Sequence, residues 1–182
     1  ESALLPGERP CAQAVLDASV SRVPVDILIF IDTSGSMGQE TQTVVDSIQQ
    51  FTEFIASSQL DYRVILVGAT TICFPPPLSS SVGCPARNGP RYYHVRLGVA
   101  STNGLVRTIE GLDRAEAFAR PDAQLHVIAV TDDESQISAE TFLDDIGARR
   151  TDVVVHGIVA TDDNGSVCCG PRGCGARVGN VY

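Results

Sequence analysis

The feature that most constrains the fold is a series of short apolar segments rich in β-branched residues. The first, residues 25–31 (VDILIFI), is nearly all apolar, which is the pattern of a strand covered on both faces. From residue 38 to residue 57, apolar side chains recur at intervals of three and four positions, which predicts a helix. A buried strand followed by a helix indicates a parallel sheet, because neighbouring parallel strands need a crossover between them.

The same pattern recurs along the chain. Strands are expected at 62–69, 92–99, 125–131 and 153–160, and helices at 105–118 and from the N-cap candidate Ser138 through Ile146. The sequence therefore predicts an α/β fold with a doubly wound, mostly parallel sheet, helices on both faces and one antiparallel edge strand, 92–99. Residues 1–24 are interpreted as an N-terminal approach segment and residues 25–182 as the single domain.

Size and composition fit a folded domain and exclude several functions. The 182 residues are 43% hydrophobic and 19% charged, and no apolar run is long enough to span a bilayer. The net charge of −9 opposes binding to nucleic acid or anionic lipid. All 13 basic residues are Arg, so a Walker A loop and lysine-based catalysis are excluded.

The six cysteines favour an oxidising compartment. The chain begins with Glu1, as a processed secretory product would, and no two cysteines have CxxC spacing, so disulfides are favoured over a metal site or free thiols. The expected pair is Cys73 with Cys84, because a proline-rich segment separates them. The partners of the others stay open: Cys11, Cys168, Cys169 and Cys174. We expect an extracellular or cell-surface protein.

Polar residues follow three of the predicted strands. Asp32, Ser34 and Ser36 follow the first, Ser101 and Thr102 the edge strand, and Asp132 the strand ending at Thr131. Ligands of such folds bind at the carboxyl ends of the strands, so these loops should converge. Their hard oxygen atoms suit Mg²⁺, with Ca²⁺ and Mn²⁺ left open, and a cation held largely by neutral hydroxyls would attract a carboxylate from another molecule.

The sequence DTSGSM after a hydrophobic strand, with TDD after a later one, resembles the von Willebrand factor type A (VWA) domain and its metal-ion-dependent adhesion site (MIDAS), DxSxS. The resemblance covers about residues 25–159. It implies that Ser34 and Ser36 ligate the ion directly and that Asp32 and Asp132 do so directly or through water. A hydroxyl of the second loop, Ser101 or Thr102, would complete the set.

Three features depart from the family pattern. Asp133 stands where Gly commonly follows the third-loop Asp, and the insertion between Cys73 and Cys84 is similar to loops of bacterial surface or secreted members. The family closes with a helix, whereas this sequence stops at Tyr182, so we expect it to be truncated. A simpler interpretation of DTSGS as a helix cap with a turn is weakened by Asp132 and by the order of the elements.

These observations predict a non-enzymatic adhesion or ligand-binding module that captures an acidic residue of a protein partner through a divalent cation. The first alternative is a structural subunit of a surface fibre or secreted assembly, which self-associates and whose metal site is mainly stabilising. An enzyme would need a positioned general base. His94, His126 and His156 all lie within strand patterns and are interpreted as packed or edge side chains.

Overall fold

The computed structural model describes residues 23–159, which form five strands and three helices. Cys11, Cys168, Cys169, Cys174 and most of the predicted approach segment lie outside these residues. The elements follow the predicted order, and their bounds are β1 (Val25–Ile31), α1 (Gly38–Ser57), β2 (Tyr62–Gly68), β3 (Tyr92–Arg96), α2 (Gly104–Arg114), β4 (Gln124–Thr131), α3 (Ala139–Gly147) and β5 (Val153–Val159).

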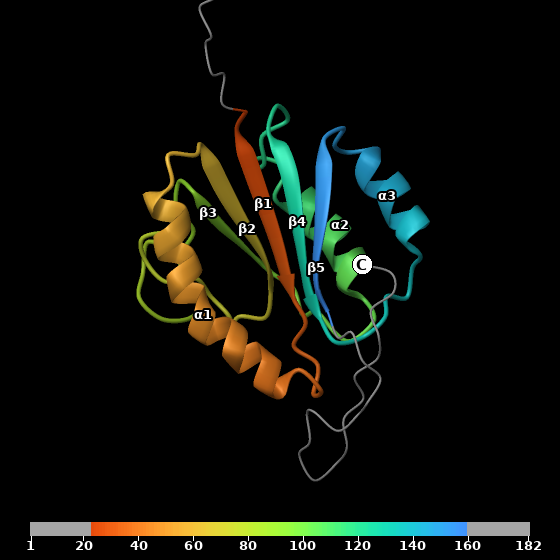
Figure 1. Cartoon of the computed structure of the whole chain (residues 1–182), viewed down its shortest axis with the longest axis horizontal. Helices are drawn as coiled ribbons and strands as arrows, with labels where there is room; N and C mark the ends of the chain where they lie inside the picture. The colour runs from red at the N-terminus through yellow and green to blue at the C-terminus, as the bar shows by residue number, and fades with distance from the viewer. Residues whose placement is uncertain (1–22, 160–182) are drawn as a thin grey trace, which may run out of the picture.

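The five strands form one sheet in the order β3-β2-β1-β4-β5, and every neighbouring pair is parallel (Figure 1). The described part of the chain thus begins with the central strand β1, continues outward through β2 and β3, and then crosses to the other side of β1. This arrangement places the carboxyl ends of β1 and β4 next to each other, with Ile31 paired to Val130.

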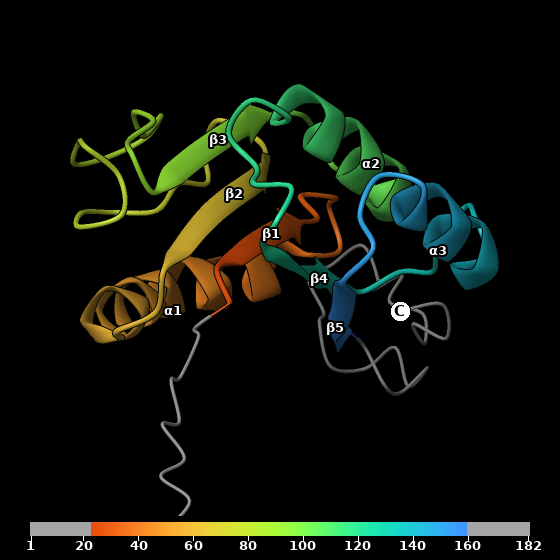
Figure 2. The same ribbon diagram turned by 90° about the horizontal axis from the view of Figure 1, so that it is seen from above.

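Alternating side chains of the strands pack into two apolar layers, one on each face of the sheet. Leu28, Phe30 and Val127 pack with residues of α2 and α3, whereas Ile29 and Leu66 pack with residues of α1. Figure 2 shows α1 on one side of the sheet and α2 and α3 on the other. The near-continuous apolar character of the central strands follows from this coverage on both faces.

The prediction of an antiparallel edge strand is not confirmed. β3 is an edge strand, but it runs parallel to β2 and pairs Val64 with Tyr92. The physical reason is the long connection of residues 69–91, which returns the chain to the amino end of the sheet before β3 begins; an antiparallel neighbour could have been reached by a tight hairpin.

The 69–91 connection contains the predicted disulfide. Cys73 and Cys84 are bonded, with their Cα atoms 5.7 Å apart. Phe74 and Leu78 of this segment are buried and join the apolar layer beneath α1. As the proline content predicts, the segment contains no helix or strand, and a single β-bridge joins Gly89 to Tyr92.

Helix α1 covers only part of its face of the sheet. An apolar groove of about 320 Å³ runs between α1 and the β4–β5 side and is lined by Phe51, Ile128 and Ile158, among others. Further along this face, His126 of β4 and His156 of β5 lie half-buried and exposed, respectively. This side of β4 and β5 is therefore the most open part of the sheet within residues 23–159.

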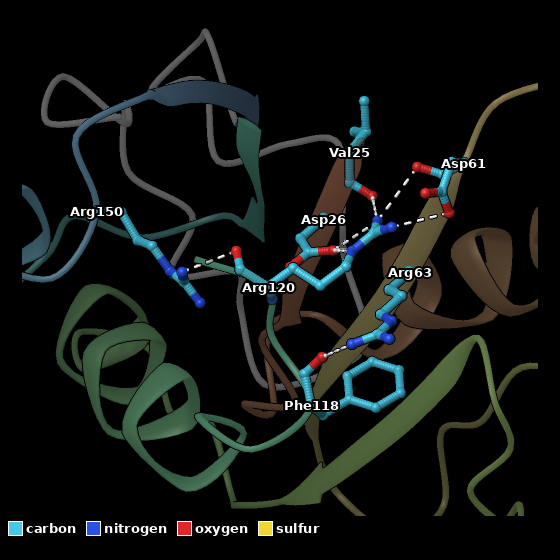
Figure 3. A network of polar contacts seen from close by, with 7 residues as sticks. All are labelled: Val25, Asp26, Asp61, Arg63, Phe118, Arg120 and Arg150. Atoms are coloured by element: carbon cyan, nitrogen blue, oxygen red, sulfur yellow. Dashed lines mark hydrogen bonds and ion pairs between the residues drawn. The ribbon is translucent and has the colours of Figure 1, made fainter. Parts of the chain in front are cut away.

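A polar network ties the segments at the amino end of the sheet together (Figure 3). Asp26 of β1 is 1% exposed, and its carboxylate accepts hydrogen bonds from the backbone N and Nε of Arg120, the latter at 3.0 Å. The Arg120 guanidinium also reaches the Val25 carbonyl at 2.9 Å and the Asp61 carboxylate at 2.8 Å. Arg120 thereby joins β1, the start of β2 and the segment before β4, at the opposite end from the predicted metal site.

Candidate metal centre

The loop after β1 is shaped by the carboxylate of Asp32. Asp32 is 0% exposed, and its Oδ1 accepts a hydrogen bond of 2.7 Å from the backbone N of Ser34. An aspartate that bonds the backbone two residues later closes a tight turn. This turn brings the hydroxyl oxygens of Ser34 and Ser36 to 3.1 Å from each other, so the DxSxS spacing gathers its side chains on one side of the loop.

The loop after β4 meets this turn through two side chains. The Ser36 hydroxyl donates to Asp132 Oδ1 at 3.2 Å, and the Thr131 hydroxyl donates to Asp32 Oδ2 at 3.0 Å. Four of the predicted residues therefore lie in one cluster: Asp32, Ser34, Ser36 and Asp132. Sequence reasoning missed Thr131, because its place beside Asp32 follows from the pairing of Ile31 with Val130, which the sequence alone does not specify.

The loop between β3 and α2 is joined to the other two through backbone groups. The backbone N and the hydroxyl of Thr33 both donate to the Val99 carbonyl at 3.1 Å. The Thr102 carbonyl accepts from the backbone N of Gln136 at 2.7 Å. The three loops that follow β1, β3 and β4 therefore meet, as predicted.

Ser101 and Thr102 themselves are not joined to the cluster. Ser101 is half-buried and Thr102 is exposed. Within residues 23–159, neither hydroxyl makes a hydrogen bond to Asp32, Ser34, Ser36 or Asp132. The contribution of this loop to cation binding therefore stays a prediction, as does the choice between Ser101 and Thr102.

The two carboxylates of the cluster have different surroundings. Both oxygens of Asp32 accept hydrogen bonds from the protein, whereas Asp132 is 4% exposed and its Oδ2 is buried without a partner in residues 23–159. Burial raises the pKa of Asp132, the hydrogen bond from Ser36 opposes this, and the nearby charges of Asp133 and Asp32 raise the pKa further. A buried carboxylate with an unpartnered oxygen is costly unless a cation or a proton compensates its charge.

The donor atoms fit a small hard cation. Neighbouring ligands of octahedral Mg²⁺, with bonds of about 2.1 Å, are roughly 3 Å apart. The separations of 3.1 Å between Ser34 and Ser36 and of 3.2 Å between Ser36 and Asp132 match this geometry. No group of three or more His, Cys, Asp or Glu side chains suited to a metal lies within the described part of the chain, so a cation here would depend on the serine hydroxyls.

Comparison of the chain with protein-family models, with curated proteins and with solved structures finds no match. The features that characterise the class of protein are therefore the parallel sheet and the oxygen-rich cluster at its carboxyl edge. Among the described residues, no helix is both long and apolar enough to cross a membrane.

Proposed function

We propose that this protein is a metal-dependent binding module of the VWA class, with a doubly wound α/β domain and a MIDAS-type site. The observation that carries the proposal is the buried Asp132 Oδ2, which has no partner among the described residues and belongs to the same cluster as the Ser34 and Ser36 hydroxyls. Ser34, Ser36 and Asp132 would hold the cation, and Asp32 would orient the loop, since both of its oxygens already accept hydrogen bonds.

A divalent cation at this position would supply a Lewis-acidic centre that accepts a carboxylate oxygen from a protein partner. Two neutral hydroxyls contribute no charge, so the cluster leaves the cation more electropositive than a cage of carboxylates would. Thr33 and Thr131 hold the three loops together, which reduces the conformational entropy lost on binding. Mg²⁺ is the proposed ion, and the disulfide between Cys73 and Cys84 is compatible with an extracellular location.

Cation binding can be measured by calorimetric titration of the whole chain with Mg²⁺, Ca²⁺ and Mn²⁺. We expect Ser34→Ala and Asp132→Asn to weaken binding at least tenfold, which corresponds to about 1.4 kcal/mol. Ser47→Ala is the matched control, because Ser47 is an exposed serine of α1 whose hydroxyl bonds within its own helix, to the Thr43 carbonyl. Equal affinities for the wild type and Ser34→Ala would contradict the site.

The adhesion step needs a second measurement on the same proteins. Immobilised peptides carrying a glutamate should retain the wild type in Mg²⁺ and release it in a chelator, and the matched glutamine peptides should not retain it. If the cation binds but no carboxylate is captured, the structural alternative, a stabilising site in a surface assembly, replaces the adhesion proposal. If no divalent cation binds, both are wrong.

A further inference from the structure

Two neighbouring histidines lie away from the loop cluster, on the open side of β4 and β5. The register pairs His126 with Val154 and Ile128 with His156, so the two histidines are diagonal neighbours on the same face. His126 Nδ1 and His156 Nε2 are 2.9 Å apart. His156 is exposed and His126 half-buried, so the pair is accessible from solvent.

The two imidazoles meet edge to edge. Their planes are 6° from parallel and their centroids are 5.2 Å apart. Because two ring atoms are only 2.9 Å apart, nearly parallel planes cannot be separated by the roughly 3.5 Å of van der Waals contact that a face-to-face stack needs. The nitrogens therefore face each other across a hydrogen bond, which directs a ring nitrogen of each residue to one point.

Neighbouring residues fix the tautomer of His126. Its Nε2 is 2.9 Å from Gln124 Oε1, an acceptor, so Nε2 carries the proton and Nδ1 presents its lone pair to His156 in the neutral ring. The Gln124 amide is oriented in turn by its 3.0 Å donation to Asp152 Oδ1. A histidine whose second nitrogen donates to an oxygen acceptor is arranged as metal-ligating histidines are.

We propose that His126 and His156 form a two-histidine site for a late first-row divalent transition metal, Ni²⁺, Cu²⁺ or Zn²⁺. Two nitrogen ligands at about 2.0–2.1 Å from one ion are about 2.9–3.4 Å apart for right-angled to tetrahedral geometry, and the observed separation of 2.9 Å lies at the edge of this range. Imidazole favours these metals over Mg²⁺ and Ca²⁺, so the site is chemically distinct from the oxygen cluster.

Binding requires two changes at His156. The proton on His156 Nε2 moves to Nδ1, the other neutral tautomer, and the exposed His156 ring rotates so that both lone pairs converge on the ion. Water or a donor from another molecule fills the remaining coordination positions. Burial lowers the pKa of His126, and the charge of His156 lowers it further while that of Asp152 raises it. The neutral form that a metal requires is therefore favoured at neutral pH.

The test is titration of the untagged full chain with Ni²⁺ in millimolar Mg²⁺, which is added to fill the oxygen site that we propose for Mg²⁺. We expect one ion per chain, and at least tenfold weaker binding to His126→Gln and to His156→Gln. The double variant should bind no more weakly than either single variant, because one imidazole alone cannot chelate. Cysteines outside the described residues are identical in all variants and cancel from the comparison.

The proton NMR signals of the histidines provide a second measurement. Paramagnetic Ni²⁺ should broaden the ring signals of His126 and His156 at substoichiometric concentration and leave those of His94 sharp. Binding with unchanged affinity in either single variant, or two weak independent ions in the wild type, would overturn the proposal and leave the pair as a structural hydrogen bond. Loss of Mg²⁺ binding in Ser34→Ala would not affect this result.

Discussion

Asp32 and Asp132 both follow buried strands, but their carboxylates differ in the hydrogen bonds that they accept. The turn amide of Ser34 and the hydroxyl of Thr131 occupy the two oxygens of Asp32. Within residues 23–159, Asp132 accepts the Ser36 hydroxyl through Oδ1, and its Oδ2 has no partner. A carboxylate with both oxygens satisfied positions its neighbours, whereas a buried oxygen without a partner is available to a cation or a proton. The difference between the two residues lies in their partners rather than in their type.

His94 provides a residue-level test by pH. This histidine of β3 is 5% exposed, its Nε2 contacts the Gly68 carbonyl at 3.2 Å, and its Nδ1 is buried with no partner in the part of the chain that the structure describes. Burial lowers the pKa of His94 below 6.5; the hydrogen bond to Gly68 opposes this, and the charge of Arg96 adds to it. Protonation would place an unpaired N–H in the core, so the unfolded chain binds this proton more readily.

The free energy of unfolding should therefore fall as the pH is lowered below 6.5 towards the pKa of His94 in the folded state. On acidification, the lowered pKa of His126 also decreases the free energy of unfolding, whereas the raised pKa of Asp132 increases it. The contribution of His94 is therefore obtained by comparing the pH dependence of the wild type with that of His94→Gln. In urea unfolding, the free energy of unfolding should decrease between pH 7 and pH 5 by up to about 1 kcal/mol less in the variant than in the wild type. Parallel curves for the two proteins would contradict a neutral buried His94.

At the level of the elements, close packing of α2 against the sheet depends on glycine. A Cβ atom added to Gly111 would lie 2.4 Å from Val67 Cγ2 of β2. Gly111 is buried, as are Leu105 and Leu112 of the same helix. The absence of a side chain at Gly111 lets the helix backbone approach the sheet more closely than alanine would allow.

Gly111→Ala should consequently destabilise the protein by about 1–3 kcal/mol, although alanine favours helix formation by roughly 1 kcal/mol over glycine. Gly147→Ala is the control, because Gly147 also lies in a helix, α3, and an added Cβ there meets nothing within 4 Å. We expect the control to be neutral or slightly stabilised in thermal unfolding. Equal melting temperatures for the two variants would show that α2 lies further from the sheet.

The sequence specified most of the elements because each has a local signal. Both β1 and α1 have the predicted bounds, and the predicted N-cap Ser138 accepts a hydrogen bond of 3.1 Å from the Thr141 amide. Features that depend on pairing across the sheet were missed. The direction of β3 follows from where the 69–91 connection ends, and the contact between His126 and His156 follows from the β4–β5 register.

For the whole molecule, the parallel sheet separates two polar regions. The candidate metal centre lies at the carboxyl ends of β1 and β4, and the network of Asp26 and Arg120 lies at the amino ends (Figures 1 and 3). The first cluster leaves a buried oxygen without a partner, whereas the second pairs its buried charges with one another. The end with Asp26 and Arg120 thus holds the fold together, and the opposite end is where we propose that a cation binds.

Removal of one partner from the Asp26–Arg120 pair tests this division of roles. The side chains of Arg120 and Asp26 are 14% and 2% exposed. Arg120→Met would leave the Asp26 carboxylate buried without its counter-charge and remove the bonds to Val25 and Asp61. We expect the free energy of unfolding, measured in urea, to fall by about 3–5 kcal/mol. The affinity for Mg²⁺ should change little at temperatures where the variant is folded.

Two further variants distinguish a charge effect from a general sensitivity of this chain to arginine replacement. Arg114→Met removes an ion pair in which the Arg114 side chain is 53% exposed. It should lower the free energy of unfolding by no more than about 1 kcal/mol. Asp26→Leu combined with Arg120→Met should recover only part of the loss, since the Asp26 carboxylate also accepts the backbone N–H of residue 120 and a leucine side chain cannot. If Arg120→Met lowered the free energy of unfolding by no more than Arg114→Met does, the Asp26–Arg120 network would not be what stabilises the amino end of the sheet.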